Sequence, residues 1–235
     1  MAVQPGDASA VEQLFNDVAP RYDRLNDLLS LGLHRQWKRQ LLAWLHPRAG
    51  ERWLDLCCGT GDLALSLARA VRSSGSVVGL DAAAAPLVLA EERRCQEPWL
   101  RVEWRHADAL ATGLASDSFD GLVMAYGLRN LADATAGMRE MHRLLKPGGR
   151  AGVLDFNRLP EVSWAGRFQR QYLRRFVVPA AALVGLEPQY AYLEASLRQF
   201  ATGPEQEAMA RHVGFRSARH RPLMAGQMGI LLLEA

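Results

Sequence analysis

Short apolar runs alternate along the chain with longer stretches in which apolar residues recur every three or four positions. The short runs are typical of buried strands, and the longer stretches are typical of amphipathic helices. This alternation predicts an α/β fold with a doubly wound, mostly parallel seven-stranded sheet of the Rossmann-like kind. The predicted strands cover residues 53–56, 77–80, 102–106, 121–125, 151–156, 216–223 and 228–233, and the helices between them begin near residues 63, 83, 132 and 204.

The first 50 residues precede the predicted sheet and show helical periodicity. Ser9 and Glu12 have the spacing of a capping box, which predicts a helix that continues to Val18. Gly32 is expected to separate two further short helices, the second of which ends at Leu45. We expect these N-terminal helices to form one wall of a substrate pocket.

Residues 157–203 interrupt the alternation between the fifth and sixth predicted strands. Aromatic residues recur there every four positions, and arginines occupy another face of the same predicted helix. Such a helix either covers its own domain as a lid or lies on a membrane surface. The aromatic residues are Trp164, Phe168, Tyr172 and Phe176, and the arginines are Arg167, Arg170 and Arg174.

The glycine-rich stretch at residues 52–63, RWLDLCCGTGDL, joins the first predicted strand to a helix. Gly59, Thr60 and Gly61 form a turn that lets a ligand approach the backbone closely. The glycine spacing also fits the loose dinucleotide pattern, so an NAD-dependent oxidoreductase is one interpretation. However, the carboxylates of Asp55 and Asp62 flank the turn, and negative charges there disfavour pyrophosphate. They favour a cationic cofactor, and S-adenosylmethionine carries both a sulfonium and an ammonium group.

Acidic residues also close the next two predicted strands. Asp81 follows the second strand about 20 residues after Gly61, where doubly wound folds place the acid that binds the ribose hydroxyls. Asp108 and Ala109 follow the third strand, within reach of an adenine amino group. The fourth strand ends before Arg129 and Asn130, beside the first strand across the expected crevice, so both residues are placed to touch substrate.

The remaining composition narrows the class of protein. A length of 235 residues suits one domain over residues 1–235, made of N-terminal helices (1–50), a cofactor-binding half (51–156), a lid insert (157–203) and a final helix with two closing strands (204–235). A net charge of +3 is too small to indicate nucleic-acid binding. Cys57, Cys58 and Cys95 lack metal-ligand spacing, so no metal is expected. With no apolar leader or span, a cytoplasmic location is expected.

Taken together, these motifs resemble the class I S-adenosylmethionine-dependent methyltransferases, and more closely the ubiquinone/menaquinone biosynthesis C-methyltransferase family. The first family signature is matched over residues 22–37, and only Leu25 departs from it, where methionine is usual. A second match covers residues 143–149. The family's usual E-x-S is replaced by Asp155, Phe156 and Asn157, a variant that resembles the cyanobacterial branch. The matching residues of the first signature are Tyr22, Asp23, Asn26, Ser30, His34 and Trp37.

The resemblance implies cofactor contacts at Thr60, Asp81, Asp108 and Ala109, and a catalytic role for residues 128–130 and for Tyr22. It implies ring C-methylation of a prenylated naphthoquinol, with the phytyl-naphthoquinol of phylloquinone (vitamin K1) synthesis favoured. Demethylmenaquinol and ubiquinone or plastoquinone precursors are alternative substrates. A non-catalytic scaffold is a remote alternative function. Peripheral contact with a thylakoid or plasma membrane is expected, and the oligomeric state is left open, a homodimer included.

The chemistry of ring methylation assigns roles to three of these side chains. The ring must be a reduced quinol, because an oxidised quinone is too electron-poor to attack a methyl group. Arg129 cannot be a base at neutral pH, since its pKa exceeds about 12. It is expected to offset the charge of the phenolate or to anchor a water, while Asn130 orients that oxygen. The ordinary pKa of histidine would allow His34 to accept a proton.

Overall fold

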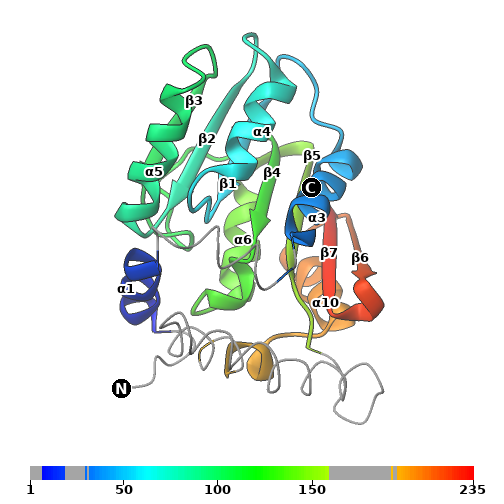
Figure 1. Ribbon diagram of the computed structural model, residues 1–235. Helices are drawn as coiled ribbons and strands as arrows, with labels where there is room; N and C mark the ends of the chain where they lie inside the picture. The colour runs from blue at the N-terminus through cyan, green and yellow to red at the C-terminus, as the bar shows by residue number, and fades with distance from the viewer. Residues whose placement is uncertain (1–6, 19–29, 31, 159–191, 193–194) are drawn as a thin grey trace.

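The structure is a computed structural model that describes residues 7–18, 30, 32–158, 192 and 195–235. Its centre is a seven-stranded sheet in the order β3-β2-β1-β4-β5-β7-β6 (Figure 1). Strands β1 to β5 pair in parallel, and β7 runs antiparallel between β5 and β6, so the prediction of a doubly wound, mostly parallel sheet is confirmed. The strands are β1 (Arg52–Leu56), β2 (Ser76–Asp81), β3 (Val102–His106), β4 (Phe119–Ala125), β5 (Leu145–Phe156), β6 (Ser217–Leu223) and β7 (Met228–Glu234).

Helices cover both faces of the sheet because alternate strand residues point to opposite sides. Leu54 of β1 packs with Met138 and Met141 on one face, whereas Trp53 packs with Leu41 and Leu67 on the other. The helices are α1 (Ala8–Val18), α3 (Leu33–Leu45), α4 (Asp62–Val71), α5 (Ala84–Cys95), α6 (Ala134–Leu144) and α10 (Gly203–Val213), with short 3-10 helices η2 (Leu128–Asn130) and η4 (Met224–Gly226).

The strand order places a crevice between β1 and β4. The chain crosses from β1 outward to β2 and β3, then returns to β4 on the other side of β1. The loops after β1 and β4 therefore separate at the carboxyl ends of the strands, which is where ligands bind in open α/β sheets. In Figure 1, α1 lies beyond this edge of the sheet, next to the start of α5. Asn16 of α1 fixes that position, because its side-chain oxygen accepts a hydrogen bond from the Ala85 backbone at 3.0 Å.

Two local predictions are wrong. The first helix is capped by Asp7, whose carboxylate accepts a hydrogen bond from the Ala10 backbone at 3.1 Å, whereas the Ser9 hydroxyl donates to Asp7. Strand β5 begins at Leu145 instead of residue 151. The residues Lys146 to Gly149, which precede the predicted strand, form an irregularity inside the observed strand, between the pairs Phe119–Leu145 and Gly121–Arg150.

Candidate active site

The glycine turn after β1 holds its shape through backbone conformations that favour glycine. Gly59 and Gly61 have φ values of 53° and 83°, in the left-handed region. A Cβ atom on Gly61 would lie 2.6 Å from the Trp104 ring, so the packing also requires glycine there. The turn is closed by a hydrogen bond from the Gly61 backbone to the Cys58 carbonyl at 3.0 Å. Helix α4 begins directly after it.

Asp81, at the end of β2, joins this turn to the start of α5. Its carboxylate accepts hydrogen bonds from the Gly59 backbone at 2.8 Å and from the Ala83 backbone at 2.9 Å. Burial raises the pKa of Asp81 above its usual value, and these backbone bonds act against that effect. The acid predicted to bind ribose is therefore already oriented by the backbone.

A cavity of about 120 Å³ opens at the carboxyl ends of β1, β2 and β4, and we call it the cofactor cavity. Five of the predicted site residues line it, and they come from four separate loops. Helix α1 contributes Val11, Glu12 and Phe15 to the wall of this cavity. Tyr126 also lines the cavity, although the sequence analysis did not single it out. The five predicted residues that line the cavity are Gly59, Asp81, Asp108, Ala109 and Asn130.

Asp55, Thr60 and Gly61 were also predicted to bind the cofactor, but they do not line the described wall of this cavity. Asp55 is 1% exposed and accepts a hydrogen bond from the Ala64 backbone at 2.8 Å, inside the first turn of α4. Burial raises the pKa of Asp55 to about 8, although Lys38 lowers it. The structure therefore places Asp55 behind the turn, where its carboxylate holds the first turn of α4.

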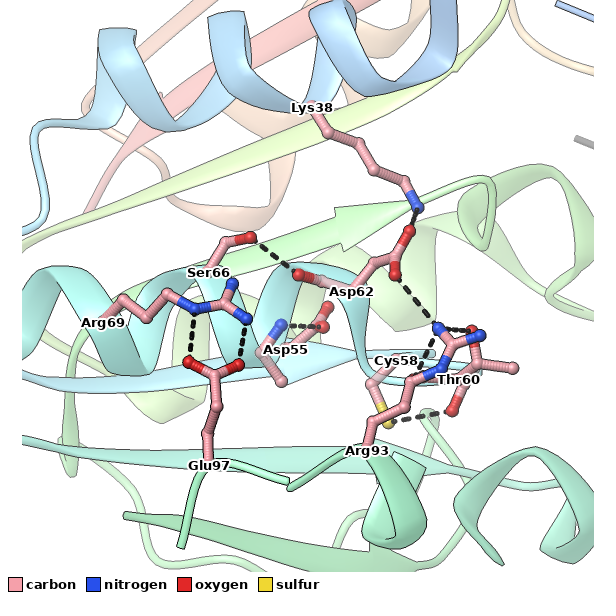
Figure 2. Close-up of polar contacts among 11 residues, drawn as sticks. Lys38, Asp55, Cys58, Thr60, Asp62, Ser66, Arg69, Arg93 and Glu97 are labelled. Carbon is pink, nitrogen blue, oxygen red and sulfur yellow. Dashed lines mark hydrogen bonds and ion pairs between the residues drawn. The ribbon is translucent and has the colours of Figure 1, made fainter. Parts of the chain in front are cut away.

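The Thr60 side chain belongs to a polar network that joins three helices (Figure 2). Arg93 of α5 donates to the Thr60 hydroxyl at 3.0 Å and to Asp62 at 3.1 Å. Lys38 of α3 donates to the other carboxylate oxygen of Asp62, also at 3.1 Å. Asp62 thus has two cationic partners from the chain itself. The sequence did not predict these two ion pairs, which engage the Asp62 carboxylate within the protein.

Arg129 lies in η2 and is almost completely buried. Its guanidinium donates to Asp155 at 2.5 Å and to the Tyr126 carbonyl at 3.0 Å, and its backbone donates to Asp155 at 3.2 Å. The guanidinium also lies 5.2 Å from the centre of the Phe156 ring. The sequence did not predict this ion pair, which means that Asp155 holds the guanidinium expected to offset the charge of the phenolate. Asp155 occupies the position where the sequence departs from the family pattern.

The Asn130 side chain is fixed at both ends. Its amide nitrogen donates to the Tyr126 carbonyl at 2.8 Å, and its oxygen accepts from the Tyr192 hydroxyl at 3.1 Å. Burial raises the pKa of Tyr192 to about 12, so the phenol stays protonated as a donor. Sequence reasoning missed this role of Tyr192.

Of the other two predicted catalytic residues, the structure describes only His34. His34 is buried in α3, with its Nδ1 atom 2.8 Å from the Ser30 hydroxyl, and it does not line the described wall of the cofactor cavity. Tyr22 lies outside the described residues, as does the helix predicted from residue 164 to 176. No cluster able to hold a metal ion occurs among the residues that the structure describes.

Comparison with known proteins identifies the family. The model of the ubiE/COQ5 methyltransferase family matches residues 3–232. A 2-phytyl-1,4-naphthoquinone methyltransferase of Thermosynechococcus vestitus is 47% identical, with 95% of this chain and 98% of that protein covered. The chloroplastic enzyme of the corresponding name from Arabidopsis thaliana is 42% identical, with 93% and 85% covered.

Solved structures support the fold at lower sequence identity. A SAM-dependent methyltransferase from Aquifex aeolicus has a TM-score of 0.61 and 16% identity, covering 84% of this chain and 88% of its own. Phosphoethanolamine N-methyltransferase 2 of Haemonchus contortus, solved with S-adenosyl-L-methionine, has a TM-score of 0.63 and 16% identity, covering 85% of this chain and 52% of its own. Because the family model matches nearly the whole chain, the chain belongs to the ubiE/COQ5 methyltransferase family, and its cofactor is S-adenosylmethionine.

Proposed function

We propose that the chain transfers a methyl group from S-adenosylmethionine to a ring carbon of 2-phytyl-1,4-naphthoquinol, in phylloquinone biosynthesis. The observation that carries the proposal is the similarity to named relatives. Cyanobacterial proteins and one plant protein named as methyltransferases of this phytylated ring are 42–47% identical to the chain over 93% or more of its length. The family assignment disfavours both an NAD-dependent oxidoreductase and a non-catalytic scaffold.

The cofactor cavity has the donors and acceptors that S-adenosylmethionine requires. Asp81 supplies a half-buried carboxylate for the ribose hydroxyls, held by two backbone N–H groups. Asp108 and Ala109 lie on the same wall, where the adenine is expected. Buried Asp55 adds a titratable carboxylate close enough to Asp81 for the charge of each to affect the other. A cationic ligand would offset that repulsion, so the residues present fit the cofactor.

When bound, the cofactor supplies an electrophilic methyl group. The chain must then hold the quinol ring in line with that group, exclude water and stabilise the negative charge that develops on the quinol oxygen. Asn130 lines the cavity with its amide orientation fixed by Tyr126 and Tyr192. Arg129, the preceding residue in the chain, provides a guanidinium that is held by Asp155. Asn130 therefore orients the oxygen, and Arg129 offsets its charge.

We further propose that the chain takes this substrate at a membrane surface. A prenyl chain stabilises membrane association by about 0.8 kcal/mol for each buried CH₂ group, so the quinol resides in a bilayer. No helix among the described residues is long and apolar enough to cross a membrane. Contact would thus be peripheral, at a thylakoid or plasma membrane and from the cytoplasmic side. A homodimer is compatible with this proposal.

A methyl-transfer assay with labelled S-adenosylmethionine tests the proposed substrate. Oxidised and chemically reduced forms of 2-phytyl-1,4-naphthoquinone are compared in detergent micelles under anaerobic conditions, together with demethylmenaquinol and a ubiquinone precursor. We expect turnover with the phytylated quinol and none with the oxidised ring. Preferred turnover of demethylmenaquinol or of the ubiquinone precursor would reassign the substrate. Equal rates with the oxidised and reduced rings would contradict the mechanism.

A further inference from the structure

A second cavity of about 620 Å³ lies beside the cofactor cavity, and we call it the outer cavity. Its size falls within the roughly 300–1,000 Å³ of small-molecule sites. It is bounded by η2 and the start of α6 on one side and by α10 with residues 196–201 on the other. The described lining comprises Leu128, Arg129, Leu131, Ala132, Ala134, Arg158, Ser196, Gln199, Phe200, Ala201, Glu205, Ala208 and Met209.

The outer cavity and the cofactor cavity share part of one wall. Leu131 and Ala132 line both cavities. The 3-10 helix η2 separates them, since Leu128 and Arg129 face the outer cavity and Asn130 lines the cofactor cavity. A ligand in the outer cavity would therefore lie next to the side chains to which the proposed chemistry is assigned.

The charges in the outer cavity are already paired within the protein. Arg129 is matched by Asp155 at 2.5 Å, and Arg158 is matched by Glu205 at 2.9 Å. No other acidic or basic side chain occurs in its described lining. A phosphate or carboxylate would have to compete with these partners, whereas an apolar ligand would not. The leucine, alanine, phenylalanine and methionine walls also favour an apolar ligand.

The outer cavity has one buried end and one solvent-exposed end. Leu128 and Phe200, at 0% and 5% exposure, form a buried apolar floor beside Arg129. Gln199, Glu205 and Ala208 are exposed and form the rim. A long apolar group attached to a ring near Arg129 could thus extend from the floor to the rim and leave the protein there.

We infer that the outer cavity binds the prenyl chain of the quinol substrate, with the ring at the boundary formed by Leu131 and Ala132. This inference rests on the proposed function for the ring, and adds to it a specificity for the length of the chain. It predicts that residues on α6 and α10 select long-chain substrates, although none of them takes part in the chemistry.

The test fills the outer cavity from both of its walls. Ala208→Trp narrows the rim on α10 at an exposed position where folding is not at risk, and Ala134→Phe narrows the opposite wall at the start of α6. Ala115→Trp, at an exposed alanine outside the described lining of both cavities, is the matched control. For each variant, kcat/KM is measured with a phytyl naphthoquinol and with a five-carbon prenyl naphthoquinol, at the same mole fraction in micelles.

We expect each cavity variant to lower kcat/KM for the phytyl substrate at least tenfold, while the five-carbon substrate changes less than threefold and the control changes neither. A fall that is equal for the two chain lengths, or no fall, would overturn the inference. Binding of the oxidised phytyl compound, measured by quenching of tryptophan fluorescence, gives an answer that does not need turnover. Weaker binding in both cavity variants would support the site even if methyl transfer failed, and unchanged binding would overturn it.

Discussion

At the scale of single residues, the buried carboxylate of Asp55 has a direct consequence for pH dependence. Burial raises its pKa to about 8 in the folded protein, whereas an unfolded chain titrates near 3.9. Between these values the unfolded chain has lost the proton that the folded protein keeps. The contribution of Asp55 to stability is therefore fully present below about pH 4 and is lost as the pH rises to about 8.

Asp55→Asn isolates this effect, because the amide oxygen can still accept the hydrogen bond from Ala64. Without cofactor, we expect the free energy of unfolding of the wild type to fall more steeply between pH 5 and pH 8 than that of the variant, as measured by urea denaturation. A cation in the site favours the ionised acid, so binding of S-adenosylmethionine near pH 7 should release protons in the wild type and fewer in the variant. Identical pH slopes in the two proteins would show that Asp55 is already ionised.

The Arg129–Asp155 pair raises a second question at this scale, namely whether Arg129 serves folding or chemistry. Arg129→Ala leaves Asp155 buried without its cation, which should destabilise the protein by about 3–5 kcal/mol. The double variant Arg129→Ala/Asp155→Ala removes both charges, and we expect it to regain most of that stability in thermal unfolding. Its kcat should nevertheless remain about 10²-fold below wild type, because the counter-charge is absent. A double variant with normal kcat would remove Arg129 from the chemistry.

At the scale of elements, the network around Asp62 joins three helices to the glycine turn (Figure 2). Burial raises the pKa of Asp62, but Lys38 and Arg93 lower it further, so that it lies below its usual value. Asp62→Asn should weaken both ion pairs, at a cost of about 1 kcal/mol or less each, since the three side chains keep some contact with water. We expect a larger effect on function, with affinity for S-adenosylmethionine reduced about threefold to tenfold in calorimetry, because the network positions the turn.

A matched control for this prediction lies on the same helix. Arg69 of α4 pairs with Glu97, just beyond α5, so this pair also links the two helices but lies away from the glycine turn. Glu97→Gln should therefore leave cofactor affinity unchanged. If both variants bind the cofactor like the wild type, the Asp62 network stabilises the helices without affecting the site.

The elements themselves could largely be predicted from the pattern of apolar residues. Strand β1, the glycine turn and α4 follow directly from Trp53, Leu54 and the left-handed glycines, because the local chain determines them. The start of strand β5 was predicted wrongly because the local composition and the strand pairing indicate different structures there. Residues 146–149 have the composition of a turn, yet pairing of the flanking residues with β4 keeps them within one strand.

At the scale of the whole molecule, the missing information was which side chains meet across the fold. The bonds Lys38–Asp62, Arg129–Asp155 and Tyr192–Asn130 join residues 24, 26 and 62 positions apart. The sequence places each residue on an element, but the choice of partner depends on how the elements pack. For this reason the loops that carry the site were predictable, whereas the pairing of the charges around it was not.

Membrane contact is the last prediction at this scale, and it concerns Arg167, Arg170 and Arg174, which lie outside the described residues. A basic residue near an anionic membrane surface contributes about 1 kcal/mol to binding. Converting all three arginines to glutamine should therefore reduce sedimentation with anionic liposomes about 100-fold. Turnover of a short-chain, water-soluble quinol analogue should stay close to normal, because that substrate need not be taken from a bilayer.

The control removes the same number of charges elsewhere. Arg69, Arg72 and Arg101 are exposed and belong to segments at the end of the sheet opposite the cofactor cavity, beside the end of α4 and the start of β3. Their replacement by glutamine lowers the net charge of +3 equally, so a general effect of charge would appear in both triple variants. A specific role for residues 167–174 requires that only the first variant loses liposome binding. Equal losses would mean that the membrane attracts the protein through its overall charge, and unchanged binding in both would mean that these arginines play no part in membrane contact.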